Sequence, residues 1–252
     1  MLKILPICIV SILLYSGCST HGSYWPGGER WREAALNAAT DPVTWIPAAG
    51  AVAVAAGGFD DKISDWAREE APVFGSEKRA NEMSDDFRDY ARYGMLATTF
   101  MVYDGEEYWL PLAERIVVEY AGVVATDRVT GWLKKKSERE RPNGTNTRSF
   151  PSGHSSAAFA YAAMANRNID RLPLTQGWKY AAQTVETSFA VLTAWARVEA
   201  GAHYPSDVLA GAALGNFISL LLHDAFLGKE STLRIRTDTQ GGDTLLVLEK
   251  AF

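Results

Sequence analysis

The sequence predicts a mainly helical protein that ends in a short β-hairpin. From residue 30 onward, Ala-rich stretches with helical spacing alternate with breaks at Pro and Gly. Residues 232–252 instead alternate apolar and polar side chains around a turn, Gln240-Gly241-Gly242-Asp243. The chain has 252 residues, of which 47% are hydrophobic and 22% charged, so it is long enough to bury a substantial core in one domain.

The first residues predict export across a membrane. Residues 1–3 are a short basic start, and residues 4–15 are an apolar run that is too short to span a bilayer, as is typical of a signal peptide. The sequence Leu14-Tyr15-Ser16-Gly17-Cys18 resembles a bacterial lipobox, which makes Cys18 the expected lipidated first residue. Tyr15 stands where this motif usually has an aliphatic residue, and an ordinary signal peptide that contains a Cys is the alternative.

The chain divides into four expected segments. They are a signal peptide of the lipoprotein type (1–17), a tether with the first helix (18–40), a main helical domain that carries the catalytic candidates (41–229) and the hairpin tail (230–252). The only cysteines are Cys8 and Cys18, and Cys8 lies in the apolar run, so no disulfide pair remains after processing. The domain must therefore be stabilised by its core.

Helical spacing and helix-start residues predict the elements in order. The expected helices are 31–39, 48–58, 62–69, 84–101, 110–136, 155–166, 178–197 and 208–227. Ser84 opens the fourth of them, and Asp85 and Asp86 fall in its first turn, where carboxylates favour the helix dipole. Pro111 and Pro205 suit the first turns of their helices.

Two of these helices are rich in small and apolar residues, 48–58 and 208–222. Because both stretches are shorter than the ~20 residues that a membrane span needs, we predict buried core helices. For helix 110–136, the predicted apolar face consists of Ile116, Val117, Tyr120, Val123, Val124 and Val129.

The charge of the chain gives no indication of a nucleic-acid partner. The formal net charge is -5, so any basic site must be local. Basic residues are concentrated in one stretch, which contains Lys134, Lys135, Lys136, Arg139, Arg141 and Arg148.

A His and a carboxylate stand four residues apart at a predicted helix start. Asp207 can reach back to one ring nitrogen of His203, which fixes the tautomer and leaves the other nitrogen unprotonated. A neutral imidazole held in this way is a nucleophile, and the carboxylate stabilises the cation that forms on attack. A purely structural His–Asp hydrogen bond is the alternative for this pair taken alone.

A second His lies at another predicted helix start, in Pro151-Ser152-Gly153-His154. Ser152 is the expected N-cap, and Gly153 permits close backbone approach at a helix N-terminus, where phosphate binds. His154 in this position can protonate a leaving oxygen. A Ser-capped helix with an incidental His is the alternative, and a serine-hydrolase elbow is disfavoured because Gly-x-Ser-x-Gly is absent here.

Three cations accompany the two His motifs: Lys134, Arg141 and Arg197. Phosphoryl transfer spreads negative charge over three equatorial oxygens, and positioned cations lower its barrier. The guanidinium fork of Arg suits such oxygens. Each cation alone is most simply a solvated surface charge, and only their spacing relative to the His motifs indicates a phosphate site.

Together, these motifs resemble the three-part signature of the type 2 phosphatidic acid phosphatase (PAP2) superfamily, which includes bacterial class A acid phosphatases, lipid phosphatases and vanadium haloperoxidases. The matching motifs are Lys134-x6-Arg141-Pro142, Pro151-Ser152-Gly153-His154 and Arg197-x5-His203-x3-Asp207. One departure is Ala196, where the family usually carries Ser. The signature covers residues 134–207, and nothing in the resemblance accounts for the hairpin.

The resemblance implies an all-α bundle with the site among loops at helix ends, and a metal-independent reaction through a phosphohistidine. It implies that His203 attacks phosphorus, that Asp207 orients His203, and that His154 gives a proton to the leaving group. The groups that it implies for holding the phosphate oxygens are Lys134, Arg141, Arg197, Ser152 and the Gly153 amide. No cofactor is expected. His21 and His223 have no expected role, because no metal-binding His or Cys spacing is present.

The predicted function is therefore a phosphatase on lipid phosphates or diphosphates. It is expected at the periplasmic side of a bacterial membrane, with a lipid anchor that favours the outer membrane over the inner. Three alternatives stay open: a non-specific acid phosphatase on soluble phosphomonoesters, a vanadium haloperoxidase, and a non-catalytic envelope lipoprotein that binds phosphorylated ligands.

Overall fold

The computed structural model describes residues 25–102, 109–228, 233–240 and 243–250, with side chains over 25–102 and 111–228. The predicted signal peptide and Cys18 lie outside these residues. Within them the helices are α2 (Gly28–Thr40), α3 (Pro42–Ala56), α4 (Asp60–Glu70), α5 (Glu77–Met101), α6 (Trp109–Ser137), α7 (Gly153–Arg171), α8 (Gln176–Glu199) and α9 (Pro205–Leu227). The predicted helical fold class is confirmed.

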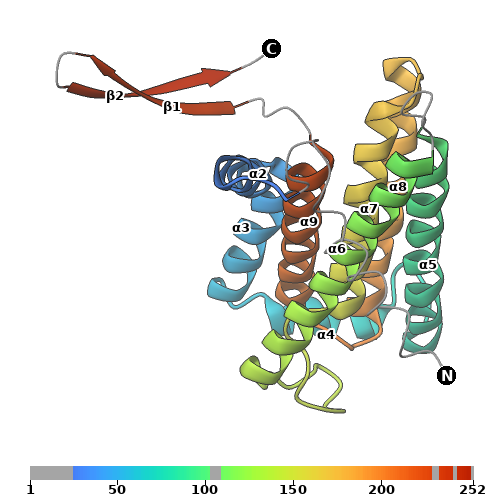
Figure 1. Ribbon diagram of the computed structural model, residues 1–252. Coiled ribbons are helices and arrows are strands. Elements are labelled where there is room, and N and C mark those ends of the chain that lie inside the picture. The colour runs from blue at the N-terminus through green and yellow to red at the C-terminus, as the bar shows by residue number, and fades with distance from the viewer. Residues whose placement is uncertain (1–24, 103–108, 229–232, 241–242, 251–252) are drawn as a thin grey trace, which may run out of the picture.

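Helix α9 forms the centre of the bundle. It packs against α6 and α7 on one side and against α2 and α3 on the other, while α5 packs against α7 and α8 (Figure 1). Among the described helices, α9 alone is long and apolar enough to cross a membrane by itself, and 61% of its most apolar window is buried inside the bundle. This burial confirms the predicted core helix.

Helices α7 and α9 approach each other closely because α9 carries glycines at the contact. A Cβ atom on Gly211 would lie 2.6 Å from the carbonyl oxygen of Ser152, and one on Gly215 would collide with the carbonyl of Ser156. The hydroxyl of Ser155 donates a hydrogen bond of 2.6 Å to the carbonyl of Val208. This contact fixes the start of α7 against the start of α9.

Helix α5 begins earlier than predicted. Ser76 is its N-cap and accepts a hydrogen bond of 3.2 Å from the backbone N–H of Arg79. Ser84, predicted as the first residue, lies inside the helix and is fully buried. Ser84 was predicted because acidic residues follow it. Ser76 followed by Glu77 is an equally good helix start, and it lies eight residues earlier in the chain.

Helix α3 is only half-buried, so the prediction of a buried core helix was wrong for this element. Its outer face exposes Trp45 (51%), Ile46 (54%) and Val52 (68%). The helix lies at the edge of the bundle and packs on α9 along one side, while the opposite side has no helix of the described bundle over it (Figure 1). No charged residue occurs within α3.

The predicted apolar face of α6 was also wrong. Ile116 and Tyr120 are 40% and 56% exposed, whereas Arg115 and Glu119 are each only 1% exposed. The buried charges are tolerated because they are paired: Asn168 accepts a hydrogen bond from Arg115 and donates one of 2.8 Å to Glu119. A prediction from hydrophobic periodicity assigns charged residues to the surface, and it therefore selected the wrong side of α6 as the buried face.

The C-terminal strands form the predicted hairpin. Strand β1 (Leu233–Gln240) pairs antiparallel with β2 (Asp243–Lys250), with Leu233 opposite Lys250. Residues 229–232 and 241–242 lie outside the described part.

Candidate active site

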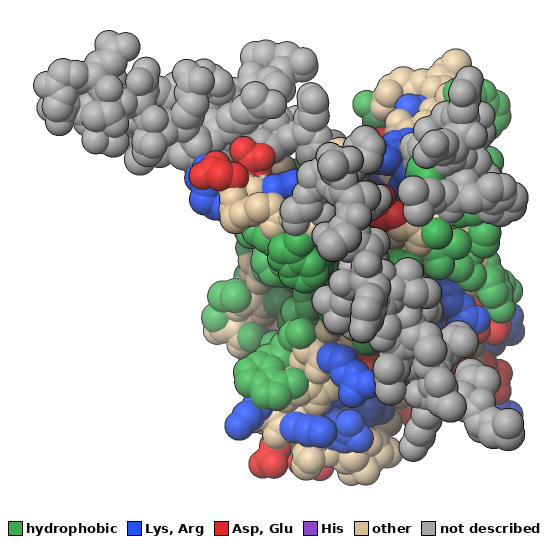
Figure 2. Space-filling view, in the orientation of Figure 1, with side chains coloured by type: hydrophobic (Ala, Val, Ile, Leu, Met, Phe, Trp, Pro, Cys, Tyr) green, Lys and Arg blue, Asp and Glu red, His purple; other side chains and the backbone are tan. Residues whose placement is uncertain are grey.

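The three sequence motifs meet at one end of the bundle, where α6 and α8 end and α7 and α9 begin (Figure 1). The backbone N–H of Ser152 donates a hydrogen bond of 3.0 Å to the carbonyl of Asp207. A Cβ atom on Gly153 would lie 3.7 Å from Cε of Lys134, so this side chain passes over the start of α7. Figure 2 shows Lys and Arg side chains gathered at this end, where Lys134, Lys135 and Lys136 form the last turn of α6.

Arg197 links the end of α8 to α5. Its side chain is 5% exposed, and its Nη1 donates hydrogen bonds of 2.6 Å to Asn81 and 3.0 Å to Ser84. Burial and the like charge of Arg141 lower the pKa of Arg197 to about 10. The guanidinium is therefore held rigidly and stays charged at neutral pH.

His203 is 1% exposed and lies among cations. Burial lowers its pKa well below the ordinary value, and the charges of Lys134, Arg197 and Arg141 lower it further. The ring is therefore neutral over the whole physiological range. A neutral imidazole has a free lone pair, which is the state that a nucleophile requires.

Asp207 does not form the predicted direct hydrogen bond to His203. The distance from Nδ1 of His203 to Oδ2 of Asp207 is 3.9 Å. Asp207 instead accepts hydrogen bonds from Arg139 at 2.6 Å, from the Ser149 hydroxyl at 2.5 Å and from the backbone N–H of Tyr204 at 2.9 Å. These shorter bonds, of which the one from Arg139 is charge-assisted, hold the carboxylate beyond hydrogen-bond distance of the ring.

His154 lies at the first turn of α7, as predicted, and its Nε2 is 2.9 Å from Oδ1 of Asp85 on α5. Burial and the charge of Arg197 lower the pKa of His154 to about 4, against the opposing effect of Asp85. Because Arg197 lowers the pKa of both His154 and His203, both rings lie within electrostatic reach of one guanidinium.

The charge of Lys134 is expected to change with pH just above neutrality. Its Nζ donates a hydrogen bond of 2.8 Å to the carbonyl of Arg148. Burial lowers the pKa of Lys134 to about 8, and the like charge of Arg141 adds to this effect. Ser152, predicted to hold phosphate, is the N-cap of α7 and accepts a hydrogen bond of 3.4 Å from the N–H of Ser155.

Three buried nitrogen atoms of the cluster have no hydrogen-bond partner within the described part of the chain. They are Nε of Arg141, Nε of Arg197 and Nδ1 of His203. Buried polar groups are almost always paired, so such a concentration indicates a place where a polar ligand completes the bonding. Two of the three groups are cationic, which favours an anion with several oxygens.

Several members of the site were not among the predicted residues. Arg139 and Ser149 donate hydrogen bonds to Asp207, Asp60 pairs with Arg139, and Asp85 pairs with His154. Arg139 belongs to the basic stretch noted from the sequence, which is the only sequence observation that points to it. Asp60 and Asp85 lie on α4 and α5, far from the motifs in sequence, so the fold alone brings them here.

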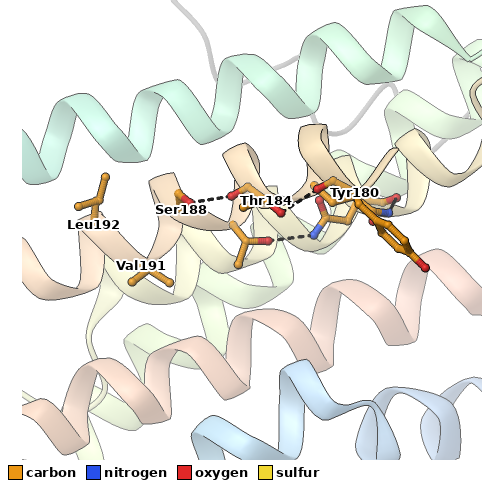
Figure 3. Close-up of a pocket in the computed structure, with 8 residues that line it drawn as sticks. Tyr180, Thr184, Ser188, Val191 and Leu192 are labelled. Carbon is orange, nitrogen blue, oxygen red and sulfur yellow. Dashed lines mark hydrogen bonds between the residues drawn. The ribbon is translucent and has the colours of Figure 1, made fainter. Parts of the chain in front are cut away.

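A groove on the described surface lies away from this cluster (Figure 3). It measures about 730 Å³ and is lined by Asn166, Tyr180, Gln183, Thr184, Thr187, Ser188, Val191 and Leu192. Its lining has no charged side chain and none of the predicted site residues, so it offers no phosphate-binding chemistry. Over the described residues, no group of three or more His, Cys, Asp or Glu side chains is arranged to hold a metal ion.

The site is thus a cationic, anion-binding cluster with two neutral imidazoles at the end of a helical bundle. Comparison with known proteins agrees with this class: the model of the PAP2 superfamily matches residues 117–230, which include all of the predicted phosphate-site and catalytic residues. Residues 117–230, just under half of the chain, thus match this superfamily.

Two named relatives share part of the sequence. Phosphatidylglycerophosphatase B of Bacillus subtilis (strain 168) is 36% identical over 107 residues, which are 40% of this chain and 53% of that protein. Lipid A 1-phosphatase of Porphyromonas gingivalis is 38% identical over 84 residues, which are 33% of this chain and 17% of that protein. The match therefore spans about half of the first relative and less than a fifth of the second.

A solved structure that aligns with this chain is the transmembrane PAP2 type phosphatidylglycerolphosphate phosphatase from Bacillus subtilis. It aligns with 87% of this chain and 94% of that chain, at 20% identity and a TM-score of 0.49.

Proposed function

We propose that this protein is a phosphatase that hydrolyses phosphate esters through a phosphohistidine on His203. The observation that carries this proposal is the convergence of a buried neutral imidazole with the unpaired Nε atoms of Arg141 and Arg197 at one end of the bundle. Cations placed around the equatorial oxygens lower the barrier to phosphoryl transfer, and no cofactor is needed to supply the nucleophile. The relatives named above are also phosphatases.

In the first step the neutral ring of His203 attacks phosphorus, so that an N–P bond forms and the bond to the leaving oxygen breaks. Lys134, Arg141 and Arg197 bind the phosphate oxygens. His154 gives a proton to the leaving oxygen; its low pKa in the free protein rises when a phosphate dianion offsets the charge of Arg197. Asp207 stabilises the imidazolium that forms on His203.

In the second step water attacks the phosphohistidine. His154, now neutral, accepts a proton from the water, the N–P bond breaks, and His203 returns to its neutral state. Phosphate is released with the same cations around it. The proton that His154 gives in the first step is thus recovered in the second.

Lipid phosphates or diphosphates are the substrate class that we propose. Both named relatives act on lipid phosphates according to their names. The exposed and uncharged face of α3 leads directly into α4, whose first residue Asp60 contacts the site through Arg139. Such a face suits the boundary of a bilayer, where Trp is favoured. Soluble phosphomonoesters are the alternative substrates.

We further propose that Cys18 carries a lipid anchor that holds the protein at the periplasmic side of the outer membrane. Support comes from the lipobox-like sequence before Cys18. Labelling cells with a radioactive fatty acid tests this: the native chain is expected to take up the label and Cys18→Ser is not. Uptake by both chains contradicts the assignment.

Phosphate release from a substrate panel tests the proposed function. The purified protein is assayed on phosphatidate, an isoprenyl diphosphate and a soluble aryl phosphate, with His203→Ala as the inactive variant. Turnover by the native chain and its loss in His203→Ala support the mechanism, and the relative rates separate lipid from soluble substrates. Retained turnover in folded His203→Ala rejects it, whereas phosphate binding without turnover indicates a non-catalytic protein.

A further inference from the structure

We propose that Arg139, anchored by Asp60, is a positioning residue that holds the Asp207 carboxylate in its ionised form beside His203. This inference rests on the proposed function, because it concerns how the nucleophile is supported. It adds a chain of three charged groups from α4, the 138–152 loop and the start of α9 to the predicted His–Asp pair.

Arg139 bridges two carboxylates with its two terminal nitrogens. Nη1 donates a hydrogen bond of 2.6 Å to Oδ1 of Asp207, and Nη2 donates one of 2.8 Å to Oδ2 of Asp60. Nη1 also lies 2.8 Å from the Ser206 hydroxyl. The guanidinium rests 4.2 Å from the ring centre of Tyr204, so that the plane of the fork is fixed by stacking as well as by hydrogen bonds.

Asp60 is itself fixed, which makes it an anchor for Arg139. Its Oδ1 accepts a hydrogen bond of 2.9 Å from the backbone N–H of Ser206, and its Oδ2 accepts one of 2.6 Å from the Ser206 hydroxyl. Burial alone raises the pKa of Asp60, but the hydrogen bonds from Ser206 and Arg139 outweigh it and lower the pKa below the ordinary value. Asp60 therefore stays ionised and keeps Arg139 in place.

The side chain of Asp207 is fully buried, and burial favours its neutral form. Burial raises the pKa of Asp207, against the hydrogen bonds from Ser149 and the charge of Arg139. The charged and titratable groups that face it come from several elements: Arg139 and Arg141 from the loop, Lys134 from α6, His203 and Tyr204 before α9, and Asp60 from α4 behind Arg139.

Among these groups, Arg139 is the one whose cation touches the carboxylate directly. Lys134 and Arg141 act on Asp207 through space, and they are also the groups proposed to bind phosphate. A neutral Asp207 stabilises the His203 cation less well, so activity is expected to fall as the pH drops through the pKa of Asp207. Removing Arg139 therefore raises the pH at which activity is lost, whereas removing Asp60 takes away a like charge and does not.

The test is the pH dependence of kcat/KM on a soluble aryl phosphate. It compares the native chain with Arg139→Gln, Arg139→Lys, Asp60→Asn and the double variant that combines Arg139→Gln with Asp60→Asn. In Arg139→Gln the acidic limb is expected to move up by about one pH unit or more, which is about a 10-fold loss of kcat/KM below the limb. Arg139→Lys keeps the charge and is expected to keep the native limb with a lower kcat. Arg128→Gln, which alters an exposed Arg on α6, is the control and is expected to match the native profile.

Asp60→Asn is expected to leave the acidic limb at its native pH or move it lower. The double variant removes both partners of the Arg139–Asp60 ion pair, so it does not leave the Asp60 carboxylate buried without its partner. Its limb is expected at higher pH than that of Asp60→Asn, which keeps the comparison valid if Arg139→Gln alone does not fold.

An acidic limb that is unchanged in Arg139→Gln, or that coincides in Asp60→Asn and the double variant, overturns the role of Arg139 while leaving the phosphatase intact. A native chain without turnover on any substrate overturns the proposed function and this inference together.

Discussion

Lys134 and His203 show how one cluster of charges sets two different protonation states. Burial and neighbouring cations lower the pKa of both groups. The imidazole is left neutral throughout the physiological range, while the ammonium, with a pKa of about 8, is still mostly charged at pH 7. The cluster thus offers a nucleophile and a phosphate-binding cation at the same pH, and it is expected to lose the cation first as the pH rises.

Phosphate affinity is therefore expected to depend on the charge of Lys134. Competitive inhibition by inorganic phosphate should weaken as the pH rises through about 8, because Lys134 then loses its proton. Lys134→Met should bind phosphate about 10-fold or more weakly at pH 7, with no such pH step. The measurement is the inhibition constant between pH 6.5 and pH 9.5, with exposed Lys135→Gln as the control. A native inhibition constant that is flat across pH 8 contradicts this assignment.

Glu186 is a residue outside the site whose protonation affects stability. Its side chain lies against Gly94 of α5, and burial raises its pKa from 4.5 to about 7. Between these two values the folded chain holds a proton that the unfolded chain releases, so the free energy of unfolding falls as the pH rises through this window. Glu186→Gln should remove the effect and be more stable than the native chain at pH 8 by about 3 kcal/mol.

Urea unfolding at pH 5 and pH 8 measures this effect. The stability difference between Glu186→Gln and the native chain should be larger at pH 8 than at pH 5. The control is Glu82→Gln, whose side chain is 62% exposed and which should show no such difference. Equal differences at both pH values would mean that the native Glu186 is not protonated when folded.

At the scale of single residues, the sequence motifs pointed to the His, Arg and Lys residues of the cluster but not to Asp60 and Arg139, which hold Asp207 in place. His154, His203, Arg197 and their partners carry recognisable spacings, whereas Asp60 meets its partner Arg139 only after α4 has packed against the start of α9. A carboxylate in the first turn of a helix is also explained by the helix dipole, so its sequence position holds no information about a distant partner.

At the scale of elements, the site depends on how closely α7 and α9 pack. Ser152 caps α7 and His154 lies in its first turn, and both move if the two helices separate. The carbonyl groups of Ser152 and Ser156 face Gly211 and Gly215, where no side chain fits without displacement.

Gly215→Ala is therefore expected to cost about 1–3 kcal/mol of stability and to lower kcat/KM, because it displaces the start of α7. Gly131→Ala on α6 is the matched control: nothing lies within 4 Å of its new Cβ atom, so stability should stay the same or rise by up to about 1 kcal/mol. The measurements are the free energy of unfolding in urea and kcat/KM for both variants. Equal stability of the two variants would show that α7 and α9 can move apart without cost.

The elements also show where periodicity is and is not informative. The apolar residues of α9 predicted its burial correctly because they occupy all sides of a central helix. In α6 the rule failed, because Arg115 and Glu119 are buried through Asn168 on another helix. Hydrogen-bond partners from a different part of the chain decide which stripe faces inward, and a local pattern does not contain them.

At the scale of the whole molecule, the bundle places the site at one end and an uncharged face along one side. The fold class was predictable because helix spacing and helix-start residues recur along the chain. The half-exposed position of α3 was not, because small apolar residues suit both a core helix and a helix at a bilayer surface.

The outer face of α3 is expected to matter for lipid substrates alone. Replacing both Trp45 and Ile46 by Ser removes two exposed apolar side chains and leaves the contact with α9 in place. Turnover of phosphatidate in vesicles should fall about 10-fold, since burying two such side chains is worth about 3 kcal/mol at most. Turnover of a soluble aryl phosphate should not change. Equal losses on both substrates would indicate damage to the fold and contradict a role at the bilayer.

The most direct test of the central claim is to trap the phosphorylated protein. The native chain is mixed with a substrate that carries a radioactive phosphoryl group, quenched in base, which preserves phosphohistidine, and digested for mapping. We expect the label on the peptide that contains His203, at a level that decays in acid, and no label in His203→Ala. Turnover at the native rate with the label on another residue, or with none at all, would contradict the account.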